Sequence, residues 1–137
     1  MVIKKTDYHF EFIDLGGGMG INYENNNKRH KQRGTISQNT VEVNSENSIE
    51  VWSSFRVARR ALINNKESLI NNNQNILSAT HDGYSRLIFN SQILHHRQII
   101  HEDNSLTIMD RILGEHHQAV SRIHLHPDVV LNYSEDN

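Results

Sequence analysis

The sequence predicts an all-β fold, an antiparallel β-sandwich that forms a single domain over residues 1–137. In most of the chain, apolar residues recur with a period of two rather than about 3.6. Turn residues separate these runs at short intervals, and the whole chain holds one proline. Short alternating runs with frequent turns are typical of sandwiches, and 137 residues suit one domain of ordinary size.

Each expected strand is an alternating run bounded by turn residues. The predicted strands are 8–13, 49–61, 93–100, 106–113 and 119–126, and the turn signals are Asp82-Gly83, Asp103-Asn104 and Gly114-Glu115. Within 49–61 we expect Phe55 to face the core and Trp52 to face a loop or another domain. Residues 57–69 are the one stretch that could be drawn as an amphipathic helix, and we expect at most a short helix within 64–73. The Asn-rich patches at 25–27 and 71–73 indicate loops.

The composition excludes several classes of function. A net charge of −2 gives no electrostatic footprint for nucleic acid or for an anionic membrane. No apolar run approaches the roughly 20 residues of a membrane helix. There are no cysteines, and residues 1–14 contain no secretory signal. The localisation of the protein is therefore left open.

Ten histidines invite a metal hypothesis, but their spacing gives little support for it. His95-His96 and His116-His117 are adjacent pairs, and neighbours on a strand point to opposite faces. His124 and His126 would share one face of a strand. They form either part of a zinc site, if a third ligand converges on them, or a His-rich surface in solvent.

Catalytic motifs of the common kinds are missing. The chain has no Gly-x-Ser-x-Gly motif, and the glycine cluster at 16–20 lacks the Gly-Lys-Ser/Thr of a phosphate-binding loop. What remains is a set of polar residues around that cluster, which is either a polar loop or part of a site: Asp14, Tyr23, Arg29, Arg33 and Gln38-Asn39-Thr40. Tyrosine can transfer protons and arginine can hold a carboxylate in bidentate fashion.

Several motifs occur in an order that is specific to one family. A tyrosine and an Arg-rich loop precede Gln38-Asn39-Thr40-Val41 and the Trp52–Arg60 segment. The later motifs are Thr80-His81-Asp82-Gly83-Tyr84, His95-His96-Arg97, Ile108-Met109-Asp110 and His124-Leu125-His126-Pro127. From about Phe10 onward the chain resembles the C-terminal domain of the heparinase II/III-like polysaccharide lyases.

The resemblance implies a β-sandwich that packs behind an α-helical toroid in an enzyme cleaving uronic-acid polysaccharides, glycosaminoglycans among them, by β-elimination. It implies Tyr23 as the catalytic tyrosine, Arg29 and Arg33 as substrate-binding residues, and Asp14 and Gln38 at the position of a zinc site. The implied partners are an acidic polysaccharide and a separate helical toroid domain.

The sequence departs from the family pattern at the metal site, and this changes what we expect of zinc binding and activity. A histidine ligand of the family is Gln38 here, and an amide oxygen is a poorer zinc ligand than imidazole. The upstream histidine segment and the toroid are also missing from this sequence. We therefore expect a degraded zinc site and a chain that is inactive alone, so whether it is itself an enzyme is left open. The alternatives are a carbohydrate-binding module that uses Tyr23, Trp52 and the Arg loop, and a purely structural module.

Overall fold

The chain is an all-β protein in a computed structural model that describes residues 2–4, 31–52, 56–71, 73–87 and 92–130. Helix is limited there to a turn at 31–33 and one 3-10 helix. The elements are β1 (Val2–Lys4), η1 (Thr35–Ser37), β2 (Val41–Val43), β3 (Ile63–Ile70), β4 (Gln74–His81), β5 (Leu94–Glu102), β6 (Ser105–Leu113) and β7 (Ala119–Ser121). All the strand pairs are antiparallel, which confirms the predicted fold class.

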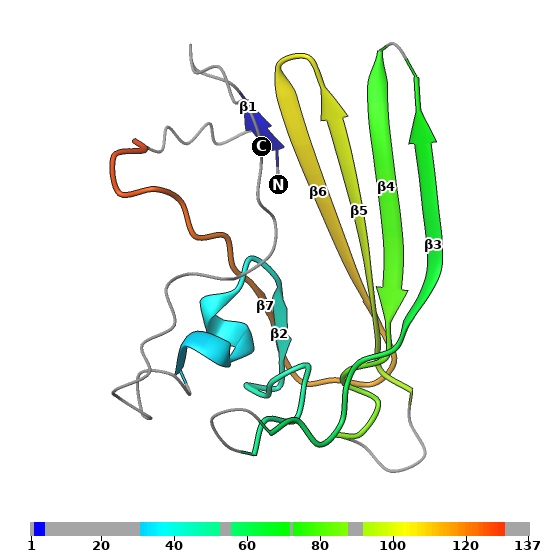
Figure 1. Ribbon diagram of the computed structural model, residues 1–137, viewed down its shortest axis with the longest axis vertical. Coiled ribbons are helices and arrows are strands. Elements are labelled where there is room, and N and C mark those ends of the chain that lie inside the picture. Colours follow the sequence, from blue (N-terminus) through cyan, green and yellow to red (C-terminus); the bar gives the residue numbers. More distant parts are fainter. Residues whose placement is uncertain (1, 5–30, 53–55, 72, 88–91, 131–137) are drawn as a thin grey trace.

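The strands form two sheets of unequal size. The main sheet has the order β1-β6-β5-β4-β3, and β2 pairs with β7 in a small second sheet. In Figure 1 the small sheet and η1 lie beside the main sheet, toward the end at which β4 and β6 finish. The architecture is an antiparallel sandwich whose small second sheet extends along only part of the main sheet.

The β5–β6 hairpin is the regular centre of the main sheet. Its register runs without a break from Leu94 opposite Leu113 to Glu102 opposite Ser105. The turn signal Asp103-Asn104 connects the two strands, as predicted. The predicted strands 93–100 and 106–113 are therefore confirmed to within two residues at each end.

The β3–β4 hairpin differs from the prediction, because β3 occupies the stretch in which a short helix was expected. The turn is made by Asn71, whose Oδ1 accepts hydrogen bonds from the backbone N–H groups of Asn73 and Gln74 at 2.9 and 2.8 Å. A β-bulge follows Asn64, and Asn65 adopts a left-handed conformation with φ of 49°. The Asn-rich composition thus serves a turn and a bulge, and pairing with β4 overrides the low strand propensity.

The segment 49–61 is also different from the prediction. It is a short hairpin rather than one strand, because Val51 forms an antiparallel bridge with Val57. Trp52 is 67% exposed, and Phe55 lies outside the described residues, as do the predicted strand 8–13 and the loop 25–27. The predicted strand 119–126 is likewise shorter than expected and ends at Ser121.

The hydrophobic core lies between the small sheet and the nearby end of the main sheet. Its fully or nearly fully buried members are Val41, Val43, Tyr84 and Ile93, with Leu87 and Ile112 packed against them. The Tyr84 hydroxyl donates a hydrogen bond to the Val41 carbonyl at 2.5 Å, so this buried polar group is paired. Burial raises the pKa of that hydroxyl, which therefore stays protonated as a donor.

Within the described ranges, no helix has the length and apolar character needed to cross a membrane.

Gly83 tests the packing of the turn after β4. A Cβ at this position would lie 2.4 Å from the Ser48 carbonyl oxygen, so backbone would have to move. We expect Gly83→Ala to lower the free energy of unfolding by about 1–3 kcal/mol, as for other overpacked positions. Gly34→Ala is the matched control, since its nearest neighbour would be the Asn47 side chain at 3.2 Å. Urea denaturation of both variants measures the difference, and equal losses would contradict this packing.

Candidate functional site

The structure describes two of the five residues that the sequence assigns to a site. Asp14, Tyr23 and Arg29 lie outside the described residues. Arg33 is half-buried in the helical turn before η1, and Gln38 is half-buried directly after η1. The assignments of all five therefore stay predictions, and the description below concerns what holds the Gln38 segment in place.

Gln38 has a polar partner within its own segment. Its side-chain Nε2 donates to the Gln32 carbonyl at 3.0 Å, and its backbone N–H donates to the Thr35 carbonyl at 3.0 Å. The amide oxygen is left as the one atom that could face a metal, and zinc favours imidazole and thiolate ligands over such an oxygen. Among the described residues there is also no group of three or more His, Cys, Asp or Glu side chains placed to hold an ion. The described residues alone thus do not make up a zinc site.

Asn39 joins this segment to the main sheet and to the chain that follows β7. Its carbonyl accepts a hydrogen bond from Arg97 Nη1 on β5. Its side-chain Oδ1 accepts the backbone N–H of His124 at 2.7 Å, and the ring of His124 lies 3.1 Å from the Ile36 carbonyl through Nε2. The chain on both sides of Gln38 is therefore tied to elements that are distant in sequence.

Arg97 is itself bound to the Asp110 carboxylate, whose hydrogen-bonding capacity is fully occupied. Asp110 on β6 accepts Arg97 Nε at Oδ1 and Nη2 at Oδ2, at 2.7 and 2.8 Å, which is bidentate geometry. His95 Nε2 approaches Oδ1 at 2.7 Å, and the Ser121 hydroxyl of β7 donates to Oδ2 at 3.2 Å. The carboxylate thus accepts four hydrogen bonds, about as many as its lone pairs allow.

The register of the main sheet explains this convergence. Ala79, Arg97 and Asp110 are directly opposite one another on β4, β5 and β6. The next row toward the core consists of His81, His95 and Ile112. Cross-strand partners share a face, so both rows point toward the small sheet.

The two histidines form a chain of hydrogen bonds with one consistent set of protons. The Gly83 N–H donates to His81 Nδ1 at 3.1 Å, so that nitrogen is an acceptor. The proton of neutral His81 is then on Nε2, which lies 3.0 Å from His95 Nδ1. His95 in turn carries its proton on Nε2, where it donates to Asp110. Both rings are neutral in this arrangement.

Electrostatics favour the same state. Burial, the neighbouring His95 and, more weakly, Arg97 lower the pKa of His81 from 6.5 to about 4, against an opposing contribution from Asp82. Burial alone would raise the pKa of Asp110, but the hydrogen bonds from His95 and Arg97 hold it far below its usual range. These pKa shifts therefore favour a neutral His81 and an ionised Asp110.

The turn after β4 uses each residue of its His-Asp-Gly-Tyr sequence. His81 enters the network, and Asp82 Oδ1 accepts the Leu62 N–H at 2.7 Å. Gly83 permits the close approach of Ser48, and Tyr84 fills the core. The sequence predicted a turn at Asp82-Gly83 and a resemblance through this motif, but it gave His81 and Tyr84 no role, because their partners are far apart in the chain.

The histidine predictions have mixed outcomes. His95 and His96 do point to opposite faces, since His96 Nδ1 pairs with Thr80 Oγ1 at 3.0 Å, away from Asp110. His124 and His126 do not share a strand face, because β7 ends at Ser121. His126 is exposed beside Asp128 at 3.5 Å.

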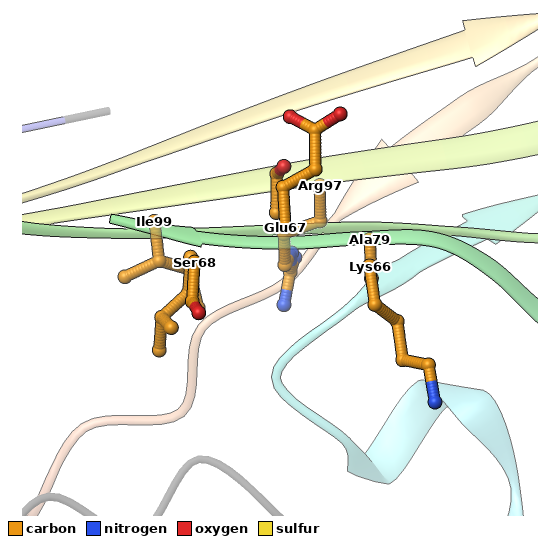
Figure 2. A pocket seen from close by; sticks show the side chains of 8 residues that line it. Lys66, Glu67, Ser68, Ala79, Arg97 and Ile99 are labelled. Atoms are coloured by element: carbon orange, nitrogen blue, oxygen red, sulfur yellow. The ribbon is translucent and has the colours of Figure 1, made fainter. Parts of the chain in front are cut away.

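A shallow hollow of about 410 Å³ adjoins the network on the same side of the main sheet. In Figure 2, Lys66, Ser68 and Ile99 point to this side and Glu67 points to the other. Leu77, Ala79 and Ile99 make most of its lining apolar. The Arg97 guanidinium at its margin is bound to Asp110, so the hollow offers no free catalytic group of the network.

The arrangement positions chain segments rather than transferring protons. Every ring nitrogen of His81 and His95 has a partner inside the protein, so neither ring has a free nitrogen to act as a base. The chemical contribution of the network is to fix the backbone at Asn39, next to Gln38.

The depressed pKa of His81 predicts a pH dependence of stability. The His81 ring binds a proton near pH 6.5 in the unfolded chain but only near pH 4 in the folded chain. The contribution of neutral His81 to the free energy of folding is therefore complete above pH 6.5. It should fall progressively as the pH drops from 6.5 toward 4. NMR titration of the His81 ring protons should give a midpoint near pH 4. A midpoint near 6.5, the ordinary value for histidine, would contradict the network.

Comparison with known proteins identifies a family for this chain. The family profile described as "Heparinase II/III-like, C-terminal" matches residues 12–137. Searches of curated proteins and of solved structures gave no significant match. The profile covers nearly the whole chain, including the β4 turn and the Asp110 network. The protein therefore belongs to the heparinase II/III-like family and corresponds to its C-terminal domain.

Proposed function

We propose that the chain is the C-terminal sandwich of a polysaccharide lyase that acts on uronic-acid glycans, including glycosaminoglycans, by β-elimination. The observation that carries the proposal is the family match over residues 12–137, which includes all five predicted site residues. We further propose that cleavage requires an α-helical toroid domain, because the residues assigned in this chain include a tyrosine as the acid but no base for the first proton transfer.

The reaction assigns a distinct task to each predicted residue. A base removes the proton next to the uronate carboxylate, the bond to the leaving glycosidic oxygen breaks, and a double bond forms in the sugar ring. Tyr23 is proposed to protonate the leaving oxygen. Arg29 and Arg33 are proposed to neutralise the carboxylate, which stabilises the anionic intermediate.

The fold supports this proposal through rigidity near the site. Arg97 and His124 fix Asn39, so the backbone beside Gln38 cannot shift freely. Sites held by packed and hydrogen-bonded supports keep their geometry better than sites on free loops. A family zinc site at Asp14 and Gln38 is proposed to be degraded, since an amide stands where the family has a histidine.

A carbohydrate-binding module without lyase activity is the second candidate. It is favoured by one observation, the exposed indole of Trp52. An aromatic ring that is open to solvent is suited to stacking against a sugar ring. This candidate predicts glycan binding with no change in the glycan.

The lyase proposal is tested with a heparinase II/III-type helical domain supplied as a second chain. With both chains present, we expect new ultraviolet absorbance from unsaturated uronate products, whereas neither chain alone should produce it. Tyr23→Phe should reduce the rate about 100-fold or more, as expected for loss of an acid–base group.

Tyr133→Phe is the matched control and should leave the rate unchanged. Cleavage by this chain alone, or full activity in Tyr23→Phe, would overturn the assignment. Glycan binding that never leads to cleavage with any helical partner would favour the binding module instead.

A further inference from the structure

One face of the hairpin at 50–59 carries an aromatic ring and a guanidinium group side by side. The backbone N–H of Trp52 donates to the Arg56 carbonyl at 3.0 Å. The adjacent residue pair in this hairpin is Val51 and Val57, which form an antiparallel bridge. Trp52 and Arg56 are therefore cross-strand partners, and such partners project from the same face. The chain between them, 53–55, lies outside the described residues.

A β-bulge brings a second guanidinium to this face. The Ala58 N–H donates to the Glu50 carbonyl at 2.9 Å, and the Glu50 N–H donates to the Arg59 carbonyl at 3.1 Å. Two residues thus oppose Glu50, which defines a bulge and shifts the alternation by one position. Arg59 consequently shares the face of Glu50 and Trp52, and the next residue, Arg60, falls on the other face.

The indole of Trp52 is both exposed and held in place. Its Nε1 donates to Glu50 Oε1 at 3.0 Å while 67% of the residue stays accessible. Arg56 and Arg59 are exposed, and no ion pair joins either of them to a carboxylate within the described ranges. The face therefore offers an oriented ring beside two cations that form no ion pair with a described carboxylate.

We propose that this hairpin face binds a carboxylated sugar chain, with one sugar ring stacked on Trp52 and carboxylates held by Arg56 and Arg59. The inference deepens the proposed function and rests on it for the ligand class, but it places the contact outside the predicted Tyr23 site. Guanidinium groups bind carboxylates in bidentate fashion, which gives the cations a chemical preference beyond charge. The overall charge of −2 argues against nucleic acid as the ligand.

Trp52 is the single tryptophan of the chain, so indole fluorescence reports on this face alone. Titration of the full chain with a galacturonic acid hexasaccharide should change the emission and saturate. A neutral maltose-type hexasaccharide should bind much more weakly, because it offers a ring but no carboxylate. Poly-glutamate should also bind weakly, because it offers carboxylates but no sugar ring.

Matched variants separate the roles on the hairpin. Arg56→Gln and Arg59→Gln should each weaken hexasaccharide binding about tenfold, as for loss of a charged hydrogen bond. Arg60→Gln removes the same charge from the opposite face and should leave the affinity within about twofold. Glu50→Gln keeps the acceptor for Trp52 but removes a negative charge, so it should tighten binding.

Three results would overturn the proposal: equal binding of the neutral sugar, equal binding of poly-glutamate, or equal weakening in Arg59→Gln and Arg60→Gln. Poly-glutamate as the preferred probe would identify an acidic protein surface as the partner. Tyr23→Phe distinguishes this inference from the proposed function, because it should abolish elimination in the two-chain assay and leave the fluorescence titration unchanged. If the hexasaccharide left the Trp52 emission unchanged while elimination in the two-chain assay stayed intact, the hairpin site would be contradicted and the proposed function would not.

Discussion

The carboxylate of Asp110 is the constraint on which the two-sheet arrangement depends. It lies on the main sheet, binds Arg97 and His95 of the neighbouring strand, and accepts the Ser121 hydroxyl from the small sheet. Arg97 carries the connection further, to the Asn39 carbonyl before β2. Among the described residues, few buried apolar side chains lie between the sheets, and this polar network adds hydrogen-bonded connections from the first sheet to the second.

The same network explains why the family motifs occur together in the sequence. His81, Arg97 and Asp110 come from three strands, yet the register places them in adjacent rows on one face. A neutral His81 is compatible with the Gly83 N–H that points at its ring. Through Arg97, the network fixes the backbone beside Gln38, where the family resemblance places a metal ligand.

Sequence reasoning succeeded where the pattern was local and failed where the pairing was distant. The strands 93–100 and 106–113 were predicted because their alternation is regular and a two-residue turn separates them. The segment 49–61 was wrongly predicted as one strand, since the period of two in the sequence continues across a hairpin in which Val51 pairs with Val57. β3 was missed because this stretch was expected to hold at most a short helix, whereas pairing with β4 decides its structure. The Asp110 network could not be predicted, because its bonds span 11 to 15 residues or more and require the register to be known.

The central claim, that Asp110 holds the small sheet to the main sheet, is tested most directly by amide hydrogen exchange in Asp110→Asn. Exchange should accelerate at the amides of Asn44 and Arg122, which donate to the carbonyls of Gln118 and Thr40 across the small sheet. Amides of the β5–β6 ladder should keep most of their protection, because that hairpin has its own unbroken register. Equal acceleration in both sheets, or none in the small sheet, would contradict the claim.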